Sequence, residues 1–174
     1  MKKFCLALFV GVCITSVGFA QVNGPNYKAG IGLRLSGSNY DAISASFKLF
    51  VTEPSAFEFN AGVRHFSYGR TNVSASAAYQ YHFPIGNIEG FKWFIGGGVS
   101  ILNSFLDQDY ENSHPDDDEG FGLALFPTGG VEYKFKFPLA VSADLRPFIF
   151  LARPYDYDKE FNPNFGISAR YTFK

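Results

Sequence analysis

Hydrophobic and polar residues alternate along eight separate stretches of this chain, and the remaining sequence joins one stretch to the next. The eight stretches span residues 27–36, 43–52, 57–64, 73–83, 91–101, 123–134, 141–149 and 165–173. In the last of them, Phe165, Ile167 and Ala169 form an apolar row, whereas Ser168 and Arg170 lie in the polar row. Successive side chains of a β-strand point to opposite faces. The pattern therefore predicts eight strands, each with one apolar and one polar face.

The charged residues of these stretches fall on the polar rows. The one ionisable residue in an apolar row is His65, which follows Val63 near a strand end. A charge on the lipid face of a barrel costs roughly 2 to 4 kcal/mol at the bilayer midplane. A soluble barrel would show the opposite arrangement, with apolar residues inside and charges outside. We therefore predict an all-β fold, an eight-stranded antiparallel up-and-down transmembrane β-barrel whose polar rows face the lumen.

The links between the predicted strands alternate between short and long, which is typical of strands that follow one another around a barrel. We expect the compact links on the periplasmic side, at residues 52–56, 84–90 and 135–140. We expect the other links outside the cell, at residues 37–41, 68–72, 103–120 and 152–163. Aromatic residues next to the compact links should form a girdle at one membrane interface. They are Tyr27, Phe57, Phe59, Tyr79, Tyr81, Phe83, Phe91, Trp93, Tyr133, Phe135, Tyr171 and Phe173.

The N-terminal segment has the pattern of a secretory signal. Lys2 and Lys3 precede an uncharged run of about 16 residues that is shorter than a membrane-spanning helix. We expect cleavage after Ala20, so that 1–20 is a signal peptide and 21–174 is the barrel. Both cysteines, Cys5 and Cys13, lie in the signal, and the mature chain would have no thiol.

Composition narrows the possible functions further. Phe 21, Tyr 10 and Gly 18 are high counts, and this mixture suits strands better than helices. Without the two lysines of the signal, 13 basic residues face 16 acidic ones, a formal charge of 13 − 16 = −3. This charge gives nucleic acid no general attraction, and we expect no cofactor.

The signal, the eight alternating stretches and the closing strand from Phe165 to Phe173 resemble the small eight-stranded outer-membrane β-barrel proteins of Gram-negative bacteria, such as the OmpW, OmpX and OmpA barrels. Residues 130–135 and 143–147 look more narrowly like barrel proteins of Bacteroidetes. The resemblance implies that Tyr171 and Phe173 form the assembly signal read by the barrel-assembly machinery, although Lys174 follows here. It also implies contact with outer-membrane lipid and lipopolysaccharide.

The polar rows carry many charges that would face one another across the lumen. An eight-stranded barrel is just wide enough for side chains to fill. We expect a salt-bridged plug rather than a wide pore, and a proton or ion path is the alternative. The predicted network consists of Arg34, Lys48, Glu58, Arg64, Lys92, Glu132, Asp144, Arg146 and Arg170.

Two prolines lie in neighbouring predicted strands, and a hairpin centred on Phe137 places Pro127 opposite Pro147. Neither residue can donate a backbone hydrogen bond. The functional hypothesis is a weak seam that opens laterally for a lipid or a hydrophobic ligand, which resembles the lateral gates of OmpW-like and palmitoyltransferase barrels. The alternative is a pair of bulges near the external rim.

Two further features could carry chemistry. The longest link is acidic, and hard cations such as Ca²⁺ accept carboxylate ligands, but the spacing is not that of an EF-hand. Its acidic residues are Asp107, Asp109, Glu111, Asp116, Asp117, Asp118 and Glu119. His65 and Ser67 share one face near the rim and resemble the His-x-Ser of lipid A deacylase barrels. Tyr68 departs from that family's pattern, and no carboxylate lies between Glu58 and Glu89.

The sequence thus favours a non-enzymatic outer-membrane barrel with a structural, adhesive or surface-interaction role. The acidic link and residues 153–157 would form its outer surface. The alternative is a binder or conduit for small hydrophobic molecules, which requires that the seam of Pro127 and Pro147 open onto an apolar pocket.

Overall fold

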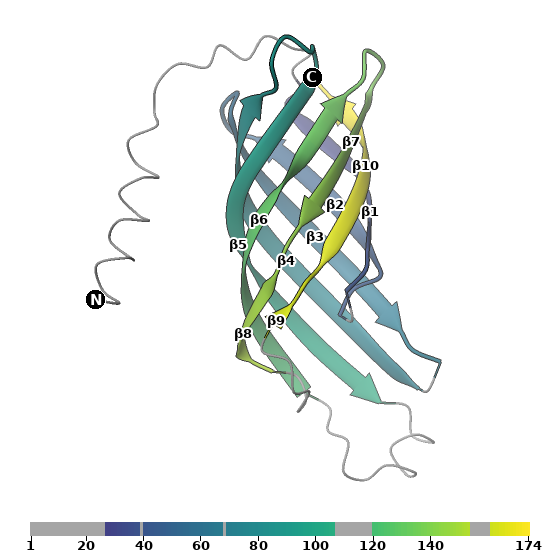
Figure 1. The fold of residues 1–174 in the computed structure, drawn as a ribbon. Helices are drawn as coiled ribbons and strands as arrows, with labels where there is room; N and C mark the ends of the chain where they lie inside the picture. The colour runs from purple at the N-terminus through teal and green to yellow at the C-terminus, as the bar shows by residue number, and fades with distance from the viewer. Residues whose placement is uncertain (1–26, 39, 68, 107–119, 154–160) are drawn as a thin grey trace, which may run out of the picture.

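The chain folds into a closed antiparallel β-barrel in the computed structural model, which describes residues 27–38, 40–67, 69–106, 120–153 and 161–174 (Figure 1). Its strands are β1 (Ala29–Ser36), β2 (Ile43–Phe50), β3 (Ser55–His65), β4 (Arg70–Pro84), β5 (Phe91–Leu106), β6 (Gly120–Lys134), β7 (Leu139–Leu145), β8 (Phe148–Ala152), β9 (Phe161–Asn162) and β10 (Phe165–Phe173). No helix in these ranges is long and apolar enough to cross a membrane.

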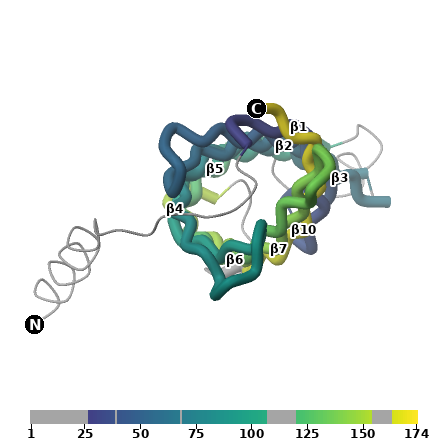
Figure 2. The backbone as a smooth tube through the Cα atoms, turned by 90° about the horizontal axis from the view of Figure 1, so that it is seen from above, coloured from purple at the N-terminus to yellow at the C-terminus, as the bar shows by residue number. Residues whose placement is uncertain are grey.

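The ten segments make eight positions in the wall. Strands β1 to β6 each pair with the next in sequence, β6 pairs with both β7 and β8, and β10 pairs with β7 and β1. The seventh strand is divided into β7 and β8 at residues 146–147, and the eighth into β9 and β10 at residues 163–164. Figure 2 shows the resulting ring along its axis. The eight-stranded antiparallel barrel predicted from the alternation is confirmed.

The wall is apolar outside and polar inside, as the alternating rows require. On β1, Ile31 and Leu33 are each 54% exposed, whereas Arg34 is 1% exposed. The same contrast recurs on β10, where Ile167 is 50% exposed and Arg170 is fully buried. This outer surface would be unfavourable in water, because apolar area that stays exposed to water costs about 25 cal/mol per Å² relative to buried area. The outer surface therefore suits contact with lipid.

The compact links lie at one end of the barrel, which we call the short-turn end, and the opposite end is the long-link end. The short-turn end contains the turns at residues 51–54, 85–90 and 135–138 and is at the top of Figure 1. Aromatic side chains gather outside this end in pairs such as Phe83 and Trp93, whose stacked ring centroids are 4.4 Å apart. Tyr27, which we expected in this girdle, points instead into the lumen and is 8% exposed. The alternation breaks between it and Ala29, since Lys28 is exposed.

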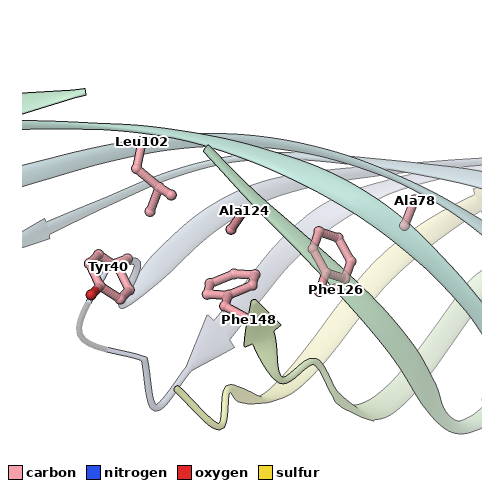
Figure 3. Close-up of a cluster of buried hydrophobic side chains, with 6 residues drawn as sticks. All are labelled: Tyr40, Ala78, Leu102, Ala124, Phe126 and Phe148. Atoms are coloured by element: carbon pink, nitrogen blue, oxygen red, sulfur yellow. The ribbon is translucent and has the colours of Figure 1, made fainter. Parts of the chain in front are cut away.

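The link between β1 and β2 lies at the long-link end, where we expected an external loop, and three of its described residues turn inward into the mouth. Ser38, Tyr40 and Asp41 are all buried. Tyr40 packs on Phe148 and Phe150, with ring centroids 6.4 and 4.9 Å apart, as Figure 3 shows for Phe148. An apolar layer therefore closes the mouth, formed by Tyr40, Ala78, Leu102, Ala124, Phe126 and Phe148.

Candidate functional site in the barrel lumen

Glu58 is the centre of a buried polar cluster inside the barrel. It lies on β3, and its carboxylate receives Arg146 Nη2 at 2.5 Å, Arg170 Nη2 at 3.0 Å and Lys48 Nζ at 3.5 Å. The side-chain amides of Gln80 and Asn60 also donate to it, at 3.0 and 3.1 Å. These donors come from β2, β3, β4 and β10 and from Arg146 between β7 and β8, so they reach Glu58 from both sides of the lumen. One carboxylate thus ties together five side chains.

Glu132 forms a second centre toward the short-turn end. Its Oε2 lies 2.7 Å from Lys48 Nζ and 3.9 Å from Arg170 Nη1. The Tyr27 hydroxyl donates to Oε1 at 2.9 Å. Tyr27 comes just before β1, so this bond ties the start of the barrel to β6. Lys48 links the two centres because it contacts both Glu58 and Glu132.

The cluster continues toward the long-link end through Arg34. Its guanidinium binds Asp144 with two hydrogen bonds, at 2.8 and 3.3 Å, and reaches Asp41 at 3.4 Å. Asp144 in turn lies 2.7 Å from Arg146 Nε, which connects this group to Glu58. The buried side chain of Asn164 accepts from Arg34 and donates to Asp41. The division between β9 and β10 at residues 163–164 thus places a polar side chain within the cluster.

The cluster forms one continuous chain of ion pairs, which we call the ion-pair chain. Each member contacts at least one residue of opposite charge, and the four positive charges equal the four negative ones. Its members are Arg34, Asp41, Lys48, Glu58, Glu132, Asp144, Arg146 and Arg170. Buried charges carry a large desolvation penalty that only close pairing and further hydrogen bonds offset. The balance explains how so many charges occupy the middle of the barrel.

Seven of the nine predicted lumen residues are members of this chain, and the other two are Arg64 and Lys92. Arg64 donates to the carbonyl of Ser38, and its guanidinium lies over the ring of Phe66. Lys92 lies near the short-turn end, with its ammonium 5.6 Å from the centroid of the Phe50 ring. Sequence reasoning missed Asp41, because it belongs to a link and not to an alternating row.

The two prolines face each other across a gap in the hydrogen-bonded ladder. Pairing of β6 with β7 ends at Gly129 and Leu145, and pairing with β8 resumes at Leu125 and Ile149 in the same register. This register places Pro127 opposite Pro147.

The prolines occupy a position at which both hydrogen bonds are lost. Phe135 N–H donates to Leu139 at the turn, and counting by twos along both strands from this pair reaches Pro127 and Pro147. Residues at such positions exchange two backbone hydrogen bonds, and neither proline has a donor. The seam therefore runs without direct pairing between its flanking rungs, which are about 13 Å apart at the usual strand rise.

The lumen side of this seam is aromatic. Phe126 and Phe148 are buried on either side of it, with ring centroids 5.5 Å apart, and the Arg146 guanidinium lies over the Phe126 ring. Thr128 Oγ1 is buried without a hydrogen-bond partner. The two prolines of the seam are on the outer, lipid-facing side of the wall. The rings of Phe126 and Phe148, which belong to the apolar layer of the mouth, lie directly inside it.

The remaining candidates are placed as follows. His65 Nδ1 lies 2.9 Å from Thr71 Oγ1 across the β3–β4 hairpin, and Ser67 is exposed in the turn. The acidic residues between 107 and 119, the signal at 1–20 and most of 153–157 lie outside the described residues. Among those that are described, no group of three or more His, Cys, Asp or Glu side chains is arranged to hold a metal ion.

Comparison with known proteins shows similarity in fold. No family model and no curated protein matches the sequence. The N-terminal β-barrel domain of Pseudomonas aeruginosa OprF superposes with a TM-score of 0.60 at 16% identity, over 85% of this chain and 100% of that one. Neisserial surface protein A superposes with a TM-score of 0.56 at 14% identity, over 83% of this chain and 94% of that one. The protein therefore has the fold of small outer-membrane β-barrels.

Proposed function

We propose that this protein is a non-enzymatic integral outer-membrane barrel with a closed lumen, which acts at the cell surface in a structural or surface-interaction role. The ion-pair chain carries this proposal, because it occupies the cross-section through which a pore would run. Ser38, Tyr40 and Asp41 are buried in the mouth beyond it. The acidic link 107–119 and residues 153–157 would then supply the contact surface outside the cell.

The same proposal covers the route to the membrane. Residues 1–20 would be removed on export, and the barrel-assembly machinery would read the closing strand with Tyr171 and Phe173. The short-turn end would face the periplasm, and lipid and lipopolysaccharide would surround the wall. The residue pattern at 130–135 and 143–147 supports a place among the Bacteroidetes-type barrels.

Conductance in a planar bilayer tests the closed lumen. The unmodified protein should give no steady current, whereas the triple variant Glu58→Ala/Arg146→Ala/Arg170→Ala should conduct, because it removes the side chains that meet at the centre. Both proteins should migrate differently when boiled and unboiled, which verifies that they are folded. Glu89→Gln, a carboxylate exposed in the turn at 85–90, is the matched control. A steady current through the unmodified barrel would contradict the proposal.

The seam supports a second candidate function, the lateral passage of a small hydrophobic molecule between bilayer and lumen. The observation that favours it is the loss of both backbone hydrogen bonds at Pro127 and Pro147, directly beside the buried rings of Phe126 and Phe148. Lipid offers no water to replace a lost backbone bond, so this part of the wall is weaker than the rest. A ligand that enters here would meet aromatic side chains.

Amide exchange tests this candidate. In the unmodified barrel, the amides of Leu125, Gly129 and Leu145 should exchange faster than those in the middle of the β2–β3 ladder. The variant Pro127→Val/Pro147→Val restores two donors and should slow that exchange, whereas Pro138→Ala in a turn should leave it unchanged. Equal and slow exchange at both ladders in the unmodified barrel would eliminate the lateral opening.

A further inference from the structure

The mouth at the short-turn end contains a pocket of about 410 Å³ that the ion-pair chain leaves empty. It spans the mouth, because its residues lie at the ends of β1, β2 and β10 on one side and in β5 on the other, and β1 and β5 are four positions apart in the ring of eight. Its lining consists of Tyr27, Lys28, Phe50, Thr52, Glu53, Lys92 and Lys174. Its size lies within the usual range for small-molecule sites, about 300–1,000 Å³.

The floor of this pocket is aromatic and firmly held. Tyr27 and Phe50 meet edge to face, with ring centroids 5.0 Å apart. The Tyr27 hydroxyl is fixed by Glu132, and the Phe50 ring also packs on His82 at 4.9 Å. Backbone bonds from Lys28 to Phe173 and from Phe50 to Lys28 hold the lining segments together. The floor is therefore a preformed apolar surface.

The rim of the pocket is positively charged. Lys28, Lys92 and Lys174 line it together with one carboxylate, Glu53, which leaves the side chains with a charge of 3 − 1 = +2. The ion-pair chain beneath carries no net charge, and its Glu132 acts electrostatically on Lys92, as Glu53 of the lining also does. The side chains that line the pocket keep a net positive charge, which favours an anion.

We infer that this pocket binds a small phosphate ester whose aromatic or acyl body lies on Tyr27 and Phe50 while its phosphate contacts Lys28 and Lys92. Ammonium groups at opposite sides of the mouth can contact one phosphate from two directions. The apolar floor would bury the aromatic or acyl body of the ester. Free inorganic phosphate has no such body and would therefore gain less from this pocket. Such a phosphate can come from a soluble ester or from the headgroup of a lipid in the adjoining leaflet.

The test uses the full barrel in nanodiscs of zwitterionic lipid, with amide chemical shifts followed by NMR. Phenyl phosphate should produce saturable shifts at Lys28, Thr52 and Lys92, and inorganic phosphate should bind more weakly because it lacks the apolar body. Benzyl alcohol, which lacks the charge, should produce none. Nanodiscs that contain phosphatidic acid distinguish the sources: displacement of phenyl phosphate assigns the site to lipid, and undisturbed binding assigns it to a soluble ester.

Variants locate the site. Lys28→Gln removes an exposed charge and should weaken phenyl phosphate binding by about fivefold. Lys92→Gln removes a buried one and should weaken it by more than about tenfold. Lys136→Gln changes a lysine at the same end but outside the pocket and should have no effect. Shifts that never saturate, equal binding of benzyl alcohol, or an equal loss in Lys136→Gln would overturn the inference.

Discussion

Removal of one charge from the ion-pair chain should destabilise the barrel far more than removal of a surface charge. Glu58→Gln is the sharpest case, because glutamine keeps the volume of the side chain and abolishes its charge. The carboxylate of Glu58 lies within 3.5 Å of three cationic groups, from Lys48, Arg146 and Arg170. The variant leaves four positive charges and three negative ones in the lumen. Loss of one partner of a buried ion pair costs about 3–5 kcal/mol, which is the loss we expect here.

A second substitution tests whether charge balance is the cause. Arg170→Met removes the cation whose ion pair with Glu132, at 3.9 Å, is much longer than its 3.0 Å pair with Glu58. The double variant Glu58→Gln/Arg170→Met has three charges of each sign and should recover at least half of the lost stability. Each single variant should therefore be less stable than the double variant. In a double-mutant cycle, this result corresponds to a large favourable coupling between Glu58 and Arg170.

Urea titration in lipid vesicles measures these differences. Trp93 is the only tryptophan, it faces outward, and its fluorescence reports its transfer from lipid to water. Glu89→Gln is the control, and it should change the free energy of unfolding by less than about 0.5 kcal/mol. A loss below about 1 kcal/mol for Glu58→Gln, or strict additivity in the double variant, would refute the argument. Either result would mean that water screens the charges of the lumen.

Three further predictions concern single contacts and are checked by the same unfolding measurement. Gly130→Ala should lower the free energy of unfolding by about 1–3 kcal/mol, because its Cβ would lie 2.2 Å from the backbone oxygen of Ala143. Gly129→Ala is the control, because its Cβ would lie 3.8 Å from the nearest atom, and it should not destabilise the barrel. Equal effects of the two variants would contradict this prediction. Tyr27→Phe should cost about 1.5–3 kcal/mol through its lost bond to Glu132, and no loss would show that water replaces the hydroxyl. Asp41→Asn should cost less than Glu58→Gln, about 1–2 kcal/mol, because its ion pair is long and lies near the mouth; a larger loss would be inconsistent.

The number of strands and the direction of most side chains could be read from the sequence. Alternation shows which face of a strand a residue occupies. The pattern is especially regular in a barrel of this kind, because charged side chains are costly on the face that contacts lipid. Glu58, Glu132 and Arg170 belong to the polar rows, and all three are buried in the structure. The rule holds only within a regular strand. Tyr27 was misplaced because the pleat ends before Ala29, where no change in the residue pattern marks it.

Contacts across the lumen could not be predicted from the rows. Alternation gives no height along the barrel axis, so it cannot say which carboxylate meets which guanidinium. Asp41 joins Arg34 only because the short link between β1 and β2 turns inward, and a polar loop sequence gives no sign of this. The division of the seventh strand at Pro147, in contrast, could be anticipated from the sequence, because proline has no backbone N–H to donate.

The link between β1 and β2 contributes Asp41 to the ion-pair chain, through its contact with Arg34. All other members belong to the wall or directly follow β7. An insertion or deletion between β1 and β2 would therefore displace one of the four negative charges, whereas the other members are held by the ladders of the wall. This link is consequently a poor place to graft a foreign peptide onto the scaffold, although it is a turn between two strands.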